Sequence, residues 1–252
     1  MPTPEQRVVA VTGASSGIGE AVAEALGRAG VLTVCLDVKP PDTVPPGGIH
    51  ITLDVTDESC VETSIASAEA QMGPLSGLVN AAGILGKLHP PERLRLSDWD
   101  REIRVDLTGT YITARAVGTR MAARGFGSIV NAASIAGMTS APTHAYSAAK
   151  AGVISLTRSL ARAWGRQGVR VNAVSPGFCR TPALIKGIHA GVLDEARMSG
   201  ITALGRLLEA SEVADAIIWL LGSGSRGVTG VNLPVDAGFL AGVTWPAYGV
   251  DN

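Results

Sequence analysis

The sequence predicts an α/β fold of three layers, in which a doubly wound parallel sheet lies between two layers of helices. Short β-branched apolar runs alternate with helix-like segments along almost all of the 252 residues. Repeated strand-then-helix order requires parallel strands, because right-handed crossovers place helices on both faces of a sheet. We find neither a linker nor an internal repeat, so we expect a single domain over residues 1–252.

The first strand and helix are the clearest elements. Val8–Val11 is a short apolar run of the kind expected for a strand buried on both faces. Over residues 18–29 the apolar positions recur at i, i+3 and i+4, which predicts a helix, and Gly30 is placed to end it. Val31–Leu36 is then predicted as a second strand, which Asp37 closes.

The same alternation continues to the end of the chain. Further strands are predicted at Ile49–Leu53, Leu75–Ala81, Ser128–Ala132, Val169–Ser175 and Val228–Val235, and helices at Ser97–Ala123, His144–Arg166 and Ser211–Leu221. The segment Thr181–Arg206 breaks the rhythm with apolar residues among several glycines. Ligands of open α/β sheets bind outside the carboxyl ends of the strands, so we interpret about 181–206 as a substrate lid. An ordinary pair of surface helices is the alternative.

Composition excludes several classes of protein. The 21 basic and 22 acidic side chains nearly cancel and form no basic stripe, which argues against nucleic acid or an anionic membrane as partner. Cys35, Cys60 and Cys179 are widely spaced, so reduced thiols are expected, with neither a disulfide nor a metal site. No apolar run reaches the ~18 residues of a membrane span. The N-terminus lacks the apolar core of a signal peptide. A soluble, cytoplasmic protein is expected.

A glycine-rich loop, Thr12–Gly19, joins the first strand to the first helix. Glycines at 13, 17 and 19 permit a tight turn and a close approach of the backbone to a pyrophosphate. The following helix presents free N–H groups and the positive end of its dipole to that anion. This pattern predicts a dinucleotide site, although a simple strand–helix turn would use glycines too.

Asp37 bears on which dinucleotide binds. An acidic side chain at the end of the second strand can bind the adenosine ribose hydroxyls, and it repels the extra phosphate of NADP. Neither Ser16 nor Val38 offers a compensating positive charge, although Lys39 is close. We therefore predict NAD, and a strand-end aspartate that merely begins a turn is the alternative.

Tyr146 and Lys150 are four residues apart in a predicted helix, which puts the phenol and the ammonium on one face. A cation about 4 Å away favours a phenolate by up to about 4 kcal/mol at an effective dielectric of ~20. That effect would bring the pKa of a tyrosine from ~10 towards neutrality, where the group can act as a general acid/base. Ser134 follows a buried strand and is placed to bind a substrate oxygen. An exposed pair and a turn serine are the alternatives.

Together these residues resemble the short-chain dehydrogenase/reductase family in its compact, single-domain, Rossmann-like branch, over nearly the whole chain. Ser134, Tyr146 and Lys150 match its catalytic residues in order and spacing, and Val235–Gly238 resembles its C-terminal strand motif. The resemblance implies a homotetramer that transfers a hydride between a secondary alcohol or ketone and NAD. It also implies that the cofactor is held by Gly13, Ser15, Ser16, Gly17, Ile18, Gly19, Asp37, Asp54, Val55, Asn80, Ala81, Ala82, Gly83, Tyr146, Lys150, Pro176, Gly177 and Thr181.

Asp106 departs from the family, which usually has asparagine there. An ionised carboxylate accepts hydrogen bonds but cannot donate them. The family's proton relay passes behind the lysine, and it survives here if it uses the main-chain carbonyl. We expect activity to survive, because an acid nearby also favours protonated Lys150. An Asp106→Asn variant with several-fold faster turnover would contradict that expectation.

The substrate is less defined than the reaction. Met138, His144, Phe178 and Leu184 are candidate pocket residues beside Ser134, with core packing or solvation as the alternatives. The low charge of the predicted lid favours a neutral, moderately apolar molecule. A dehydratase or epimerase on this scaffold and a non-enzymatic NAD-binding sensor are the other functions considered. The aromatic tail, residues 243–248, is expected to pack on a neighbouring subunit or on its own domain.

Overall fold

A seven-stranded sheet forms the centre of the computed structural model, which describes residues 7–86 and 88–242. Its strands are β1 (Val8–Thr12), β2 (Leu32–Asp37), β3 (Ile49–Thr52), β4 (Leu75–Asn80), β5 (Gly127–Ala132), β6 (Val169–Pro176) and β7 (Asn232–Val235). Their order is β3-β2-β1-β4-β5-β6-β7, and each neighbouring pair is parallel. From β1 the chain adds β2 and β3 on one side of the sheet and then β4 to β7 on the other. Ligands of doubly wound folds bind at this switch point, between β1 and β4.

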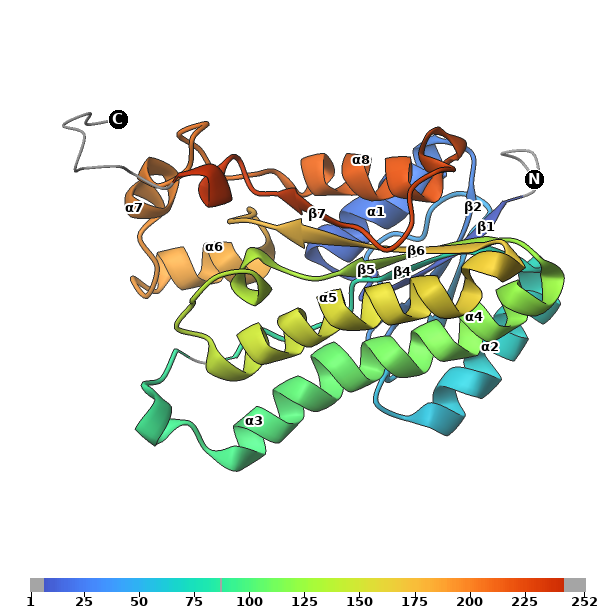
Figure 1. Ribbon diagram of the computed structural model, residues 1–252, viewed down its shortest axis with the longest axis horizontal. Coiled ribbons are helices and arrows are strands. Elements are labelled where there is room, and N and C mark those ends of the chain that lie inside the picture. The colour runs from blue at the N-terminus through green and yellow to red at the C-terminus, as the bar shows by residue number, and fades with distance from the viewer. Residues whose placement is uncertain (1–6, 87, 243–252) are drawn as a thin grey trace.

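Helices cover both faces of the sheet, which confirms the predicted three layers (Figure 1). One face carries α1 (Gly17–Arg28) and α8 (Ala210–Leu221), which pack against each other. The other carries α2 (Glu58–Met72), α4 (Thr110–Arg124) and α5 (His144–Trp164). The remaining helices are α3 (Leu96–Glu102), α6 (Pro182–His189) and α7 (Glu195–Gly200), and single 3₁₀ turns lie at Pro91–Arg93, Ile135–Gly137, Gly165–Gln167, Ser223–Ser225 and Phe239–Ala241.

Apolar side chains on the two faces of the strands make the two large cores of the protein, and a small third cluster contains Ala133, Val153, Ile154 and Ala173. Val8, Ala10 and Leu78 point towards α2 and α4, whereas Val9, Val11 and Val79 point towards α1 and α8. Strands buried on both faces need continuous apolar runs, and such runs made the central strands predictable from the sequence. Within the described residues, none of the helices is both long and apolar enough to cross a membrane.

A network of buried polar residues connects the centre of the sheet to α4 and α5 by hydrogen bonds. Asn80 on β4 donates to Oδ1 of Asn131 on β5 at 2.9 Å, and it accepts from Oγ1 of Thr113 at 2.7 Å. Asn131 in turn donates to Thr157 on α5 at 2.9 Å. Buried amides are tolerated in a core when their hydrogen-bonding groups find partners. This network holds β4, β5, α4 and α5 in one arrangement beside the carboxyl ends of the strands.

Two predicted elements differ by more than two residues from the observed ones. The expected helix Ser97–Ala123 is divided into α3, a π-helical segment Ile103–Gly109, and α4. Such π-helical turns are frequent at functional sites. The predicted strand Val228–Val235 begins only at residue 232, because Gly230 adopts a φ of +77° and turns the chain. The aromatic tail at 243–248 lies outside the described residues.

Candidate active site

A cavity of about 850 Å³ opens at the carboxyl ends of β4, β5 and β6. Its lining combines the first two turns of α5, the loops after these strands, and the segment predicted as a lid. The residues that line it from the predicted site are Ile18, Ala81, Gly83, Asp106, Ser134, Tyr146, Lys150, Pro176, Gly177, Phe178, Thr181 and Leu184. Side chains separated by more than 150 residues in the sequence therefore share one chamber.

The glycine loop has the geometry that a bound diphosphate needs. Gly13 has a φ of +68°, and a Cβ atom there would lie 2.7 Å from the backbone nitrogen of Ala82. A Cβ on Gly19 would overlap the carbonyl oxygen of Gly13, so α1 and the loop approach as closely as their backbones allow. Within the described chain, Ser16 makes no capping hydrogen bond with its side chain at the start of α1. The N–H groups of that first turn can therefore bind an anion.

Asp37 lies at the end of β2 and contacts this loop directly. Its carboxylate accepts hydrogen bonds from the backbone nitrogen of Ser15 at 3.0 Å and from that of Lys39 at 3.2 Å. The hydroxyl of Ser15 donates to the carbonyl of Lys39 at 2.5 Å. A carboxylate is thus held beside the glycine loop, where the ribose of a dinucleotide would lie. The residues present fit an adenine dinucleotide.

Ser134, Tyr146 and Lys150 all line the cavity. Lys150 is 4% exposed, donates to the carbonyl of Ala132 at 3.0 Å, and has its Nζ atom 5.4 Å from the centre of the Tyr146 ring. Ser134 follows β5, and its Oγ atom accepts from the backbone nitrogen of Ala136 at 3.1 Å. That contact occupies an acceptor position of the hydroxyl, so its proton stays available for a substrate oxygen.

Asp106, from the π-helical segment, contacts Lys150. Its side chain is 0% exposed, with Oδ1 3.2 Å from Nζ of Lys150 and Oδ2 accepting from the nitrogen of Ile84 at 3.3 Å. Among the described residues Oδ1 has no well-aligned hydrogen-bond donor, so its contact with Lys150 is an ion pair. Burial raises the pKa of Asp106, and the charge of Lys150 opposes that rise. The main-chain carbonyl of Asp106 accepts from Oγ1 of Thr110 at 2.8 Å.

The segment predicted as a lid forms one wall of the cavity. Thr181 packs beside Gly17 of the glycine loop and caps α6, accepting from the nitrogen of Leu184 at 3.4 Å. The backbones of Cys179 and Leu208 form an isolated parallel β-bridge, where the segment leaves and rejoins the body of the protein. The lining residues that this segment supplies are apolar or small: Ala183, Leu184, Gly187, Val192, Leu193, Met198 and Ile201.

Several predicted residues lie outside the lining of the cavity. Met138 is exposed and accepts a hydrogen bond at its sulfur from Asn232 at 3.1 Å, and His144 begins α5. Asp54 bonds the nitrogen and hydroxyl of Thr56, both at 2.8 Å, and Val55 packs against Gly109. Their assignment to substrate or cofactor remains a prediction. The side chain of Asn80 is occupied by the buried network.

Sequence reasoning missed other walls of the cavity. The loop after β4 contributes Leu85, Leu88 and His89, and the loop before α5 contributes residues 139–143. Phe239 follows β7 and packs edge-on against Phe178, with ring centres 5.4 Å apart. These loops have no periodicity, so nothing in the local sequence indicated which of their residues face inward.

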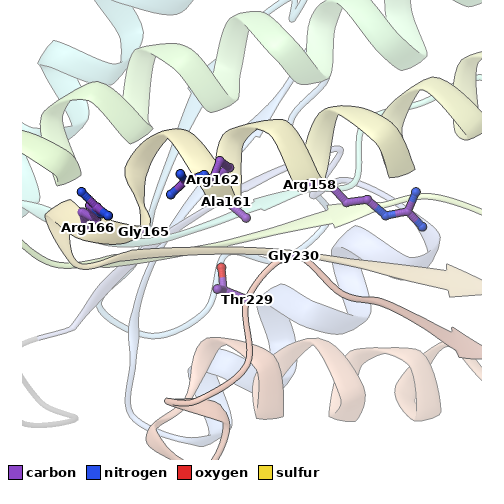
Figure 2. A pocket seen from close by; sticks show the side chains of 7 residues that line it. All are labelled: Arg158, Ala161, Arg162, Gly165, Arg166, Thr229 and Gly230. Carbon is purple, nitrogen blue, oxygen red and sulfur yellow. The ribbon is translucent and has the colours of Figure 1, made fainter.

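A second, smaller hollow lies between the carboxyl-terminal half of α5 and the loop that leads to β7 (Figure 2). Arg158, Arg162 and Arg166 line it together with Thr229 and Gly230, over a volume of about 380 Å³. It lacks a carboxylate, a histidine or a tyrosine among its described residues. In the same described part of the chain, no group of three or more His, Cys, Asp or Glu residues could hold a metal ion.

Comparison with known proteins identifies relatives of this arrangement. A family model described as enoyl-(acyl carrier protein) reductase matches residues 13–240. The chain is 40% identical to the cis-4-hydroxycyclohexanecarboxylate dehydrogenase of Sinomonas cyclohexanicum, over 94% of this chain and 97% of the relative. It is 34% identical to the D-threitol dehydrogenase of Mycolicibacterium smegmatis, over 92% of each.

A solved structure from Brucella melitensis 16M, described as a ribose-5-phosphate isomerase, is also similar. It has a TM-score of 0.93 and 44% identity over 98% of each chain. The fold, the cavity and these relatives agree with the resemblance drawn from the sequence. The chain belongs to the short-chain dehydrogenase/reductase family and is an oxidoreductase.

Proposed function

We propose that this enzyme transfers a hydride between NAD(H) and a neutral, largely apolar secondary alcohol or ketone, with Tyr146 as general acid/base. One observation carries the proposal: Ser134, Tyr146 and Lys150 line the same cavity as the segment Pro176–Thr181, whose last residue lies against Gly17 of the glycine loop. Substrate oxygen, proton donor and hydride acceptor can therefore meet at one place.

Each of the three residues has a separate part in the reaction. Nicotinamide, when bound, supplies the hydride acceptor or donor. The hydroxyl of Ser134 donates to the substrate oxygen, since its acceptor side is occupied by the nitrogen of Ala136. In oxidation the alcohol proton passes to the phenolate of Tyr146, and in reduction it returns to the new alkoxide. Lys150 favours that phenolate by its charge, 5.4 Å from the ring centre.

Asp37 supports NAD as the preferred dinucleotide. Its carboxylate is held beside the glycine loop by the nitrogen atoms of Ser15 and Lys39. The 2′-phosphate of NADP would place a dianion next to this group, and Coulomb repulsion opposes that arrangement. The ribose hydroxyls of NAD donate hydrogen bonds to a carboxylate instead.

The lining of the cavity supports a neutral, apolar substrate. Leu184, Leu193, Met198, Ile201 and Phe178 surround the space beyond the catalytic residues. Lys150 and His89 are the basic side chains among its described lining, and Lys150 is paired with Asp106. A sugar phosphate, as the name of the Brucella relative suggests, would need more positive charge than this. The substrates named for the two dehydrogenases, a hydroxycyclohexanecarboxylate and threitol, carry no phosphate. The proposal of a neutral, apolar substrate therefore rests on the lining of the cavity and not on these names.

The decisive experiment follows NADH formation by purified protein with NAD⁺ and a panel of secondary alcohols. Tyr146→Phe is the matched variant, because it removes the phenolic hydroxyl and keeps the ring. Turnover with NAD⁺ that is lost in Tyr146→Phe, and a weaker response with NADP⁺, would support the proposal. NADH binding without turnover would favour the sensor, and product without any change in NADH would favour a dehydratase or epimerase.

We also propose that the chain assembles as a homotetramer in the cytoplasm and that residues 181–206 act as a lid. The family resemblance supports the tetramer, and light scattering after size-exclusion chromatography would test it. Cys35, Cys60 and Cys179 are all free, which accords with a reducing compartment. A lid predicts that NADH and a substrate analogue protect residues 181–206 from proteolysis or hydrogen exchange.

A further inference from the structure

Arg180 lies where β6 leads into the proposed lid, and the proposed reaction does not use it. Its neighbours Cys179 and Thr181 both line the cavity. Its guanidinium pairs with two carboxylates from different elements, those of Glu195 and Glu209. One of these carboxylates belongs to the lid and the other to the body of the protein, so the side chain of Arg180 connects the two.

Backbone hydrogen bonds fix both ends of the lid at one place. The nitrogen of Arg180 donates to the carbonyl of Leu208 at 2.8 Å, and the nitrogen of Leu208 donates to the carbonyl of Phe178 at 2.9 Å. Near the carboxyl end of the lid, the nitrogen of Leu204 donates to the carbonyl of Ala237 at 3.0 Å. Hinges commonly consist of a few residues at the ends of such elements. The chain between these ends therefore depends on other contacts to stay over the cavity.

The ion pair between Arg180 and Glu195 reaches from this base to α7, which lies beside α6 at one end of the molecule (Figure 1). Glu195 begins α7, and Met198 lies one turn further along the same helix. The side chain of Met198 is buried and lines the cavity. Because residues three apart on a helix share a face, a contact that fixes Glu195 also fixes Met198 in the cavity wall.

The second ion pair of Arg180 reaches the start of α8. Nε of Arg180 lies 3.5 Å from Oε1 of Glu209. The nitrogen of Glu209 donates to Oε2 of Glu212 at 2.9 Å, within a capping box at the start of this helix. Arg206, at the other end of the lid, donates to both oxygens of Glu212 at 2.7 and 2.8 Å. Carboxylates at the start of α8 therefore bind an arginine at each end of the lid.

An arginine is suited to a contact with two partners. Its planar guanidinium presents five N–H donors in a fixed fork, whereas lysine is a compact point charge. The side chains of Arg180 and Glu195 are 39% and 37% exposed, so solvent weakens their attraction. Pairs of this kind change an equilibrium only a few-fold, which is small for unfolding but large enough to matter for the movement of a loop.

We propose that Arg180 is a positioning residue that holds the lid over the cavity by joining Glu195 of α7 to Glu209 of the body. While both pairs are made, Met198 stays in the cavity wall. When they break, the lid between its fixed ends is free to move away and the cavity opens. Arg180 can have this role only if residues 181–206 act as the proposed lid.

Hydrogen exchange of the ligand-free protein tests this contact without turnover. Arg180→Gln keeps a long polar side chain and removes the charge. We expect the amides of residues 182–200 to exchange about two- to fivefold faster in Arg180→Gln at low salt. In about 1 M NaCl, where the Debye length is ~3 Å, the difference between the two proteins should shrink. Equal exchange in the two proteins at low salt would overturn the proposal.

Arg197→Gln is the matched control. Arg197 is 88% exposed and pairs with Asp194 at 3.3 Å, so its ion pair lies within the lid and should not affect lid opening. Glu195→Gln removes the other partner of the contact with Arg180. Combined with Arg180→Gln, it should give exchange no faster than that of Arg180→Gln alone, because both changes break one contact. An equal rise in Arg197→Gln, or full additivity in the double variant, would contradict the proposed role.

Steady-state kinetics connect this contact to the proposed reaction. The KM for a secondary alcohol should rise about two- to fivefold in Arg180→Gln, with kcat changed by less than about twofold, since the lid binds substrate and transfers neither proton nor hydride. Arg180→Lys should recover part of this loss, because it keeps the charge. An unchanged KM would overturn the positioning role. If no alcohol is turned over, the proposed function fails, while hydrogen exchange still decides whether Arg180 holds the lid.

Discussion

Oδ1 of Asp106 lies 3.2 Å from Nζ of Lys150, and both side chains are almost completely buried. Lys150 therefore has a full counter-charge behind it. Its Nζ atom also donates to the carbonyl of Ala132 and lies 5.4 Å from the centre of the Tyr146 ring. The side chain of Asp106 contacts Lys150, whereas its main-chain carbonyl accepts a hydrogen bond from Thr110. The two parts of this residue therefore have separate partners.

Replacement of Asp106 tests whether this counter-charge is needed. We expect Asp106→Asn to lower turnover by less than about tenfold, since the amide oxygen still faces Lys150 but no longer carries charge. Asp106→Leu should lose about 3–5 kcal/mol of unfolding free energy, because it leaves a buried ammonium unpaired. Steady-state kinetics and urea denaturation measure the two effects. Several-fold faster turnover in Asp106→Asn would show that a donating amide, as in the rest of the family, is the better residue here.

Asp37→Ser tests the choice of dinucleotide. Removing the carboxylate should raise the ratio of kcat/KM for NADP⁺ to that for NAD⁺ by about tenfold or more, because repulsion of the 2′-phosphate is relieved. Part of the loss with NAD⁺ will come from the glycine loop, since the nitrogen of Ser15 loses its acceptor. Asp42→Ser, in the exposed loop that follows, is the control. An unchanged ratio would exclude Asp37 as the selecting residue.

The buried thiols should be unreactive in the folded protein. Burial raises the pKa of Cys35 to about 11, and burial with the nearby charges of Glu209 and Glu212 raises that of Cys179 to about 12. The thiolate is the reactive form, so alkylation at pH ~8 should modify the half-buried Cys60 first. Mass spectrometry of peptides before and after denaturation would measure this. Rapid labelling of Cys179 in the native protein would mean that the base of residues 181–206 opens.

Asn80 should matter for stability more than for cofactor contact. Asn80→Ala leaves Oδ1 of Asn131 without its donor, which costs about 1–3 kcal/mol for an unsatisfied buried group. The side chain points into the sheet, so the Kd for NADH should change by less than about threefold. Chemical denaturation and NADH fluorescence titration give the two quantities. Thr113→Val is the milder comparison, and a large loss of NADH affinity in Asn80→Ala would assign this side chain to the cofactor.

Local sequence predicted most of the fold because its signals are short-range. The strands buried on both faces are continuous apolar runs, and β1 and β2 lie within one residue of their predicted bounds. Tyr146 and Lys150 share a helix face for the same reason, since helical geometry follows from spacing alone. The glycine loop could be predicted from its glycines and from its position between a strand and a helix. Where the chain departs from regular geometry, as at the π-helical segment and at Gly230, periodicity held no information.

Only the tertiary structure decided which distant side chains meet. Asp106 and Lys150 are 44 residues apart in the sequence, and Phe178 and Phe239 are 61 apart, yet each pair is in contact. Such contacts depend on how the π-helical segment and α5, or β6 and the turn after β7, pack around a shared core, which no local pattern encodes. The sequence by itself determined the reaction's chemical groups and their scaffold. Packing of the helices and loops determined the charge behind the lysine and the apolar walls of the cavity.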